Sequence, residues 1–239
     1  MKVLVTGDIH ADFNHLNTLI NDKNPDLLLA CGDFGYWPKE FLKDEDTSIY
    51  SYSIGSRKRK IKPMPQLSDI KIQKSQIRFC DGNHENHWAL GALTNLEIVP
   101  NIFYQPRGSI YTLPDGRNIL FFGGADSIDK NLRTVGYDWF PEENISQKDM
   151  FNLPDCKIDI IISHTCPTEF LPSLTKCKGI SFTKGRDSNC EALSQILNIY
   201  KPKLWYFGHW HVNCTDFIKD CRFYAMSLTK DTHWWRWLE

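Results

Sequence analysis

Six short apolar runs, each ended by a glycine or a polar turn, most strongly constrain how this chain can fold. The runs are Val3–Val5, Leu27–Cys31, Ile77–Cys80, Ile119–Phe122, Ile158–Ile162 and Leu204–Phe207. Uninterrupted apolar runs of this length are typical of strands that are buried on both faces. Helical periodicity lies between some of them, in residues 13–20 and 191–199. This alternation of strand and helix predicts an α/β fold.

The middle and the end of the chain predict a second, partly antiparallel sheet. Pro114-Asp115-Gly116 separates two strand-like stretches and indicates a β-hairpin. We expect Phe223–Leu228 and Trp234–Leu238 to add strands to this second sheet. A polar stretch at residues 38–75 interrupts the pattern, and about 40 residues bury too little core to fold independently. We therefore expect one domain over residues 1–239 with a surface insertion at 38–75.

Side chains of the kind that bind metals follow five of the six runs. Asp8 and His10 follow the first run, Asp33 the second, Asn83 and His84 the third, His164 the fifth, and His209 and His211 the sixth. Ligands of open α/β sheets bind beyond the carboxyl ends of the strands, so these side chains are expected to meet at one sheet edge. Glycine precedes four of the motifs and leaves room for an ion beside the backbone. One motif alone would be an ordinary strand-end turn, but five together predict a metal centre.

These motifs resemble those of a known enzyme family. Gly7-Asp8-Ile9-His10, Gly32-Asp33, Gly82-Asn83-His84-Glu85, His164 and Gly208-His209-Trp210-His211 stand in the order found in the calcineurin-like metallophosphoesterase superfamily. The segments around Asp33, Asn83 and Gly123–Asp129 are similar to small bacterial and bacteriophage members. The resemblance implies a four-layer α/β/β/α sandwich of two mixed sheets, with a site for two metal ions between the sheets.

The resemblance also implies a role for each motif residue. One divalent ion would be held by Asp8, His10 and His211, and the other by Asn83, His164 and His209, with Asp33 bridging the pair. Oxygen and imidazole ligands suit Mn²⁺, Fe or Zn²⁺; Mn²⁺ is the first choice, and Ni²⁺ and Mg²⁺ stay open. Asp33 is also a weaker candidate for a catalytic partner of His84, since it would already be engaged with metal. His84 would contact the substrate together with Asn83 and assist the leaving oxygen without binding metal.

Other residues near the motifs have weaker assignments. Arg133 offers the planar fork that phosphate favours, although an isolated arginine is more often a surface residue. Tyr36 either lines the substrate pocket or packs in a hydrophobic turn. Asp12 is placed to cap a helix over residues 13–20. The basic run Arg57–Lys60 either contacts a polyanion or belongs to a solvated loop.

Net charge, hydropathy and cysteine pattern indicate which environments and partners the protein has. The formal net charge of -1 predicts no general attraction to nucleic acid or to a membrane surface. No apolar run approaches the roughly 20 residues of a membrane span, and the first residues show no signal-peptide pattern, so we expect a cytoplasmic protein. None of the 8 cysteines forms a Cys-x-x-Cys pair. We expect reduced thiols, with disulfides as the less supported alternative.

Three functions follow from this pattern. The favoured one is hydrolysis of a phosphate monoester or diester of a small molecule, nucleotide or nucleic acid by metal-activated water. A protein Ser/Thr phosphatase is the alternative, but those relatives carry Gly-Asp-x-x-Asp-Arg-Gly where this chain has Gly32-Asp33-Phe34-Gly35-Tyr36-Trp37-Pro38. A non-catalytic metal-binding scaffold is the third, and it would be favoured by eroded ligands, of which the sequence shows none.

Overall fold

Two mixed β-sheets form the centre of the computed structural model, which describes residues 1–41, 65–72, 74–179 and 187–239. In the first sheet the order is β12 (Trp235–Trp237), β1 (Val3–Thr6), β2 (Leu27–Ala30), β3 (Gln76–Phe79), β5 (Ile102–Tyr104) and β4 (Glu97–Val99). In the second it is β10 (Cys214–Ile218), β11 (Cys221–Ala225), β9 (Leu204–Phe207), β8 (Ile160–Ser163), β7 (Asn118–Phe122) and β6 (Ser109–Thr112). All six apolar runs are confirmed as strands, and the predicted hairpin is β6–β7.

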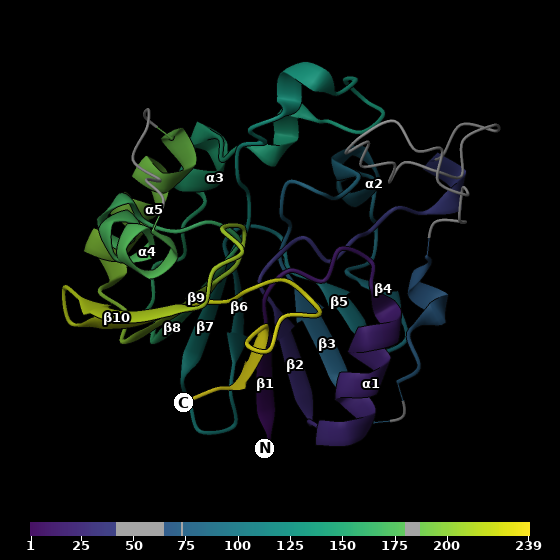
Figure 1. The fold of residues 1–239 in the computed structure, drawn as a ribbon, viewed down its shortest axis with the longest axis horizontal. Coiled ribbons are helices and arrows are strands. Elements are labelled where there is room, and N and C mark those ends of the chain that lie inside the picture. Colours follow the sequence, from purple (N-terminus) through teal and green to yellow (C-terminus); the bar gives the residue numbers. More distant parts are fainter. Residues whose placement is uncertain (42–64, 73, 180–186) are drawn as a thin grey trace.

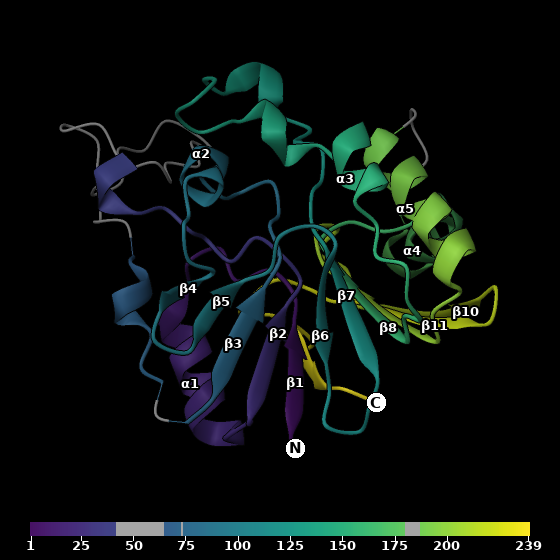
Figure 2. The same ribbon diagram turned by 180° about the vertical axis from the view of Figure 1, so that it is seen from behind.

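Helices cover the outer face of each sheet, as Figures 1 and 2 show from opposite sides. The α-helices are α1 (Phe13–Lys23), α2 (His87–Gly91), α3 (Gln147–Phe151), α4 (Leu171–Lys178) and α5 (Ser188–Tyr200). Short 3₁₀ turns occur at Lys39–Phe41, Leu67–Asp69, Lys130–Leu132, Pro141–Glu143 and Thr168–Phe170. Helix α1 packs on the first sheet, whereas α4 and α5 pack on the second. The result is the expected four-layer α/β/β/α sandwich.

Successive side chains of a strand point to opposite layers, which explains why the apolar runs are uninterrupted. Leu28 of β2 belongs to the core under α1, while Leu29 belongs to the core between the two sheets. Ile161 of β8 faces α4 and α5, and Ile162 faces the first sheet. Each buried leucine or isoleucine contributes about 1.5–3 kcal/mol of transfer free energy. Both faces of the central strands are therefore fixed by packing, and with them the register.

Parallel pairing in register brings the ends of the central strands together. Thr6 of β1 pairs with Ala30 of β2, and Ala30 pairs with Phe79 of β3. In the second sheet Ile162 of β8 pairs with Tyr206 of β9. The turns that follow these strands therefore emerge side by side. The segment between β7 and α3 lies at the end of the molecule opposite the two termini (Figure 1).

The structure confirms the predicted cap of α1 and corrects the position of the last strand. The side chain of Asp12 accepts a hydrogen bond from the backbone N–H of His15 at 3.4 Å. Strand β12 was expected in the second sheet, but it pairs antiparallel with β1 of the first, with Trp237 opposite Leu4. The Gly7 N–H donates to the carbonyl of Trp234, which extends this pairing towards the first metal motif. The end of the chain therefore covers an edge of the first sheet that β1 would otherwise expose.

Only part of the expected insertion at 38–75 belongs to the described residues. Leu67 and Ile70, just after the undescribed stretch, pack into the core under α1. The basic run Arg57–Lys60 lies outside the described residues. In the described part of the chain, no helix is long and apolar enough to cross a membrane.

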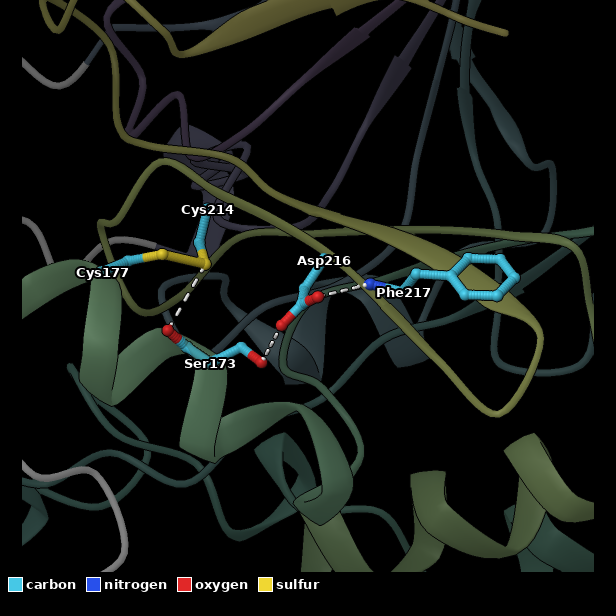
Figure 3. The surroundings of a disulfide bond; sticks show 5 residues. All are labelled: Ser173, Cys177, Cys214, Asp216 and Phe217. Atoms are coloured by element: carbon cyan, nitrogen blue, oxygen red, sulfur yellow. Dashed lines mark hydrogen bonds between the residues drawn. A yellow bond between two sulfur atoms is a disulfide. The ribbon is translucent and has the colours of Figure 1, made fainter.

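A disulfide corrects the expectation that all cysteines are reduced. Cys177, near the end of α4, is bonded to Cys214, the first residue of β10 (Figure 3). Beside it, the Ser173 hydroxyl donates a hydrogen bond to Asp216 at 2.5 Å, so α4 and β10 are joined twice. The six other cysteines are free thiols. The two bonded residues are separated by 37 positions, and the fold alone brings them together.

Candidate metal centre

The turns that carry the metal-type residues have unusual backbone conformations. His10 after β1, Asp33 after β2, and His209 and His211 after β9 all have positive φ, between 44° and 65°. This region costs a residue with a side chain on the order of 1–3 kcal/mol, and such residues gather at functional sites. Four residues predicted to bind metal therefore occupy strained positions that the surrounding structure must hold.

Glycines next to these residues allow close packing that no other residue would permit. A Cβ atom on Gly208 would lie 1.9 Å from Asp8 Oδ1, and one on Gly82 would lie 2.2 Å from Asp33 Oδ1. A Cβ on Gly32, whose φ is +85°, would lie 2.5 Å from His164 Nδ1. Each glycine thus makes room for a metal-type side chain that comes from another strand.

Asp8, His10 and His211 form a first group at the ends of β1 and β9. Their ligand atoms all lie within 4.8 Å of one another. Asp8 is fully buried, and its Oδ2 is 3.0 Å from Nε2 of His211. The His209 N–H points at both Asp8 carboxylate oxygens, at 3.0 Å each. The carboxylate is therefore fixed by backbone and side-chain donors.

Asn83, His164 and His209 form a second group. Asn83 Oδ1 lies 3.0 Å from His164 Nε2 and 3.0 Å from His209 Nδ1. The other nitrogen of His164, Nδ1, is 2.7 Å from the carbonyl oxygen of Cys31 and donates to it. A hydrogen bond of this kind fixes the tautomer of a metal-binding histidine and leaves Nε2 as the ligand atom.

Asp33 lies between the two groups and contacts both. Its Oδ2 is 3.5 Å from His10 Nε2 in the first group. Its Oδ1 is 3.3 Å from His164 Nε2 in the second group and accepts the His84 N–H at 2.8 Å. One carboxylate oxygen therefore faces each group. The seven residues lie together, but they follow strands of both sheets and not, as expected, of one sheet edge.

The buried carboxylates shape the titration of the histidines. Burial opposes a charge on His164, but Asp33 and Asp8 outweigh it and raise the pKa of this histidine to about 10. Burial, with the nearby His164, lowers the pKa of His209 to about 3. A cation bound by the same atoms would balance the two carboxylates in place of the proton on His164, and would release that proton.

The residues fit divalent cations. Nε2 of His10 is buried and makes no hydrogen bond with any of the described residues, although it faces the other atoms of its group. Buried polar atoms rarely lack a partner, and an ion is one of the explanations when they do. Carboxylate, amide oxygen and imidazole nitrogen match Mn²⁺, Fe or Zn²⁺.

His84 and Arg133 lie together at the edge of the centre. Nη2 of Arg133 is 3.2 Å from His84 Nε2 and 2.8 Å from Asp129 Oδ1. A guanidinium can only donate, so His84 Nε2 accepts, and this imidazole is neutral with its proton on Nδ1. Burial, with Arg133 and His10, lowers the pKa of His84 to about 4. His84 Nδ1 or Nε2 also falls within 4.8 Å of the ligand atoms of His10 and Asp33.

Tyr36, a candidate for the pocket wall, and the nearby His87 are both buried. Tyr36 is 6% exposed and packs in the core under α1, so little of its surface is available to a substrate. The Nε2 atom of His87 is 3.0 Å from the carbonyl oxygen of Gly82.

Buried acidic residues that sequence reasoning overlooked hold the metal-bearing turns. The Glu85 carboxylate accepts the N–H groups of Gly35 at 3.1 Å and Gly82 at 2.6 Å, and so ties together the turns after β2 and β3. The position of Glu85 directly after a metal motif was the available signal. Ser127, which contacts Asn83, lies in the segment Gly123–Asp129 that resembles family members, although no role was expected for it. Glu143, which binds Ser127, carried no signal of its own.

The four-layer sandwich brings this cluster of carboxylate, amide and imidazole groups together at the ends of strands from both sheets. The family model "Calcineurin-like phosphoesterase" matches residues 1–213, and the chain belongs to this family. The description of this family names phosphoester hydrolysis.

Two relatives illustrate the range of the similarity. The lariat debranching enzyme of Gallus gallus is 25% identical over 250 residues, which cover 92% of this chain and 44% of that enzyme. This chain thus spans less than half the length of that relative. The solved structure of TT1561 from Thermus thermophilus has a TM-score of 0.54 and 14% identity, covering 95% of this chain and 88% of that one. This second likeness concerns the fold.

Proposed function

We propose that the chain uses two divalent cations, with Mn²⁺ the first choice, to hydrolyse a phosphodiester of nucleotide or nucleic-acid type. The observation that carries the two-ion part is the position of Asp33, with one carboxylate oxygen towards each group of ligand atoms. The diester part is supported by the similarity to a lariat debranching enzyme. A protein phosphatase has no comparable support, because the arginine-containing motif of those enzymes is absent after Gly32-Asp33.

In this proposal the seven ligand residues divide as the two groups do. Asp8, His10 and His211 would hold one ion, Asn83, His164 and His209 the other, and Asp33 would contact both. When bound, such a pair of ions lowers the pKa of a water molecule and neutralises charge on phosphoryl oxygens. The side chains supply the anchoring that keeps both ions in place.

Arg133 and His84 would act on the substrate itself. Arg133 is 10% exposed at its side chain and already anchored by Asp129, so its guanidinium is preorganised to bind a phosphate oxygen. Its present donation to His84 Nε2 occupies the atom that would serve a leaving oxygen. Binding of phosphate by Arg133 would release this nitrogen. His84 Nε2 would then take up a proton from solvent and donate it to the leaving oxygen.

Paired chromogenic substrates test the proposed reaction. We expect the Mn²⁺-loaded protein to hydrolyse a bis-nitrophenyl phosphate faster than the nitrophenyl monoester, and activity to be lost on chelation. Faster hydrolysis of the monoester would overturn the diester assignment. Fewer than two ions per chain by metal analysis of the active protein would overturn the two-ion assignment.

The variant His84→Ala tests the role of His84. We expect turnover of the diester to fall by about 10²–10⁴-fold, the usual contribution of a general acid, with two ions still bound. His87→Ala is the matched control, because His87 lies nearby and is buried but contacts only a backbone carbonyl among the hydrogen bonds described. Equal turnover in His84→Ala and the unmodified protein would remove His84 from the reaction.

A further inference from the structure

The amide of Asn83 must present its oxygen, and not its nitrogen, to the two imidazoles of the second group. An asparagine side chain has nearly the same shape in both orientations, so packing alone does not select one. Only the oxygen can bind a cation. Whatever contacts the other end of the amide therefore decides whether this position is a ligand.

Ser127 is the residue at that other end. Asn83 Nδ2 donates to Ser127 Oγ at 3.0 Å. Ser127 is 1% exposed and lies in the loop after β7. A hydroxyl can both donate and accept, so Ser127 by itself would tolerate either orientation of the amide.

Glu143 removes this ambiguity. Its Oε2 accepts the Ser127 hydroxyl at 2.7 Å, and its Oε1 accepts the Ser127 backbone N–H at 2.7 Å. Because the hydroxyl hydrogen is committed to the carboxylate, only lone pairs of Ser127 Oγ face Asn83. The amide nitrogen must then point to Ser127 and the amide oxygen to His164 and His209.

Glu143 is itself held in place. It is fully buried, and its backbone carbonyl accepts hydrogen bonds from Arg107 Nη2 at 3.0 Å and from the Ala125 N–H at 3.1 Å. Arg107 also binds Asp81, two residues before Asn83. The loop that carries Glu143 and the turn that carries Asn83 are thus anchored to the same guanidinium.

We propose that Glu143 and Ser127 are positioning residues that fix the amide orientation of Asn83 and so make it a metal ligand. The inference rests on the proposed metal-binding role of Asn83. In this proposal the loop between β7 and α3 contributes to metal binding, because part of the affinity for the second ion comes from the Glu143 carboxylate, which does not touch the ion. Residues of this kind typically change metal affinity by about 10–100-fold.

Titration of Mn²⁺ into the metal-stripped protein by calorimetry tests the proposal. We expect Ser127→Ala to weaken one of two binding events by about 10–100-fold. We expect Glu143→Gln to do the same, because the new amide can donate to Ser127 Oγ and free the hydroxyl to donate to Asn83. Ser194→Ala is the matched control, since Ser194 also donates to a glutamate, Glu169, at 2.6 Å but lies on α5. Its affinities should equal those of the unmodified protein.

A double-substitution cycle separates orientation from general support. In an Asn83→Asp protein both terminal atoms are oxygens, so orientation no longer matters. Adding Ser127→Ala to that protein should change the Mn²⁺ affinity by no more than about twofold, which is the deviation from additivity that is usual for two substitutions that do not interact. Equal weakening in both backgrounds would overturn the orienting role and leave a structural one.

Two further outcomes are distinguishable from each other. If Ser127→Ala and Glu143→Gln bind Mn²⁺ as the unmodified protein does, the positioning role is refuted while the metal centre stands. If the unmodified protein binds no Mn²⁺, Zn²⁺ or Fe²⁺, the proposed function fails. Thermal melts of each metal-stripped variant show whether it is folded, and the Asn83→Asp cycle is read only between folded proteins.

Discussion

Replacing Gly208 by alanine tests whether close packing around Asp8 is what forms the first ligand group. The new Cβ would lie 1.9 Å from Asp8 Oδ1 and 3.0 Å from its Cγ. Contacts under 3.0 Å essentially do not occur for real Cβ atoms, so the carboxylate must retreat by about 1 Å or more. Metal–ligand distances tolerate only about 0.2 Å. Asp8 would therefore cease to be a ligand.

The fold should survive this change even though the ion does not bind. Overpacking a buried position costs about 1–3 kcal/mol, which lowers the free energy of unfolding without abolishing the native state of a domain of this size. Loss of a residue that only hydrogen-bonds to a ligand typically weakens metal affinity by up to roughly 100-fold. Loss of the Asp8 carboxylate itself should weaken the affinity for the first ion by more than that. We expect Gly208→Ala to bind one Mn²⁺ fewer per chain after dialysis at low micromolar metal.

The assay is metal analysis by mass spectrometry together with thermal unfolding. Gly91→Ala is the control, because nothing lies within 4 Å of its added Cβ and it ends the helix α2. That variant should keep both ions and be as stable or up to about 1 kcal/mol more stable. A Gly208→Ala protein with the full metal content and turnover would refute the packing argument.

Three other predictions concern stability. Arg107→Ala should lower the free energy of unfolding by about 3–5 kcal/mol at pH 7, because it leaves the buried Asp81 carboxylate unpaired. Burial opposes the charge of Asp81, yet Arg107 and His87 keep its pKa below the usual value. In the variant the unpaired carboxyl takes up a proton as the pH falls towards 4, so the difference in unfolding free energy between the two proteins should shrink. A pH-independent difference in urea titrations would contradict this. Cys177→Ser should cost about 3–4 kcal/mol under oxidising conditions, from the 37-residue separation that the bond closes, whereas Cys156→Ser, at an exposed free thiol, should cost nothing measurable. Equal melting temperatures with and without reductant would show that the bond does not stabilise the protein. Chelation should lower the melting temperature of the Mn²⁺-loaded protein. If free Mn²⁺ was at 100 times its dissociation constant before chelation, the free energy of unfolding should fall by about 2.7 kcal/mol. An unchanged melting curve would mean that the folded chain binds no ion.

The sequence predicts the strands, and it marks the metal-type residues that follow them, because both signals are local. An apolar run, a glycine and a carboxylate or imidazole stand next to one another in the chain, as in Leu27–Cys31 followed by Gly32 and Asp33. Parallel pairing in register places the turns after β1, β2 and β3 at one end of the first sheet and those after β8 and β9 at one end of the second. The packing of the two sheets against each other then brings the two sets of turns together.

What the sequence does not predict depends on contacts between distant segments. The last strand joins the first sheet because Trp237 pairs with Leu4, a choice between two sheet edges that no local pattern makes. Cys177 and Cys214 meet because α4 ends where β10 begins. The apolar turn at Tyr36 fits a pocket wall or a core equally well by composition, and only packing in the core under α1 decides between them.

The same contrast explains why the sequence indicated no role for Ser127 and Glu143, although the structure places them beside Asn83. A ligand must be Asp, His or Asn, and its turn must accept positive φ or a neighbouring glycine, so chemistry and backbone both mark it. A residue that orients a ligand needs only a donor or an acceptor at the right distance, which many residue types can supply. The identity of Ser127 is set by a hydrogen bond across 44 positions to Asn83 and another across 16 to Glu143. Four of the residues with positive φ lie where the ions would bind, whereas Ser127 and Glu143 lie beside Asn83, which is not among them.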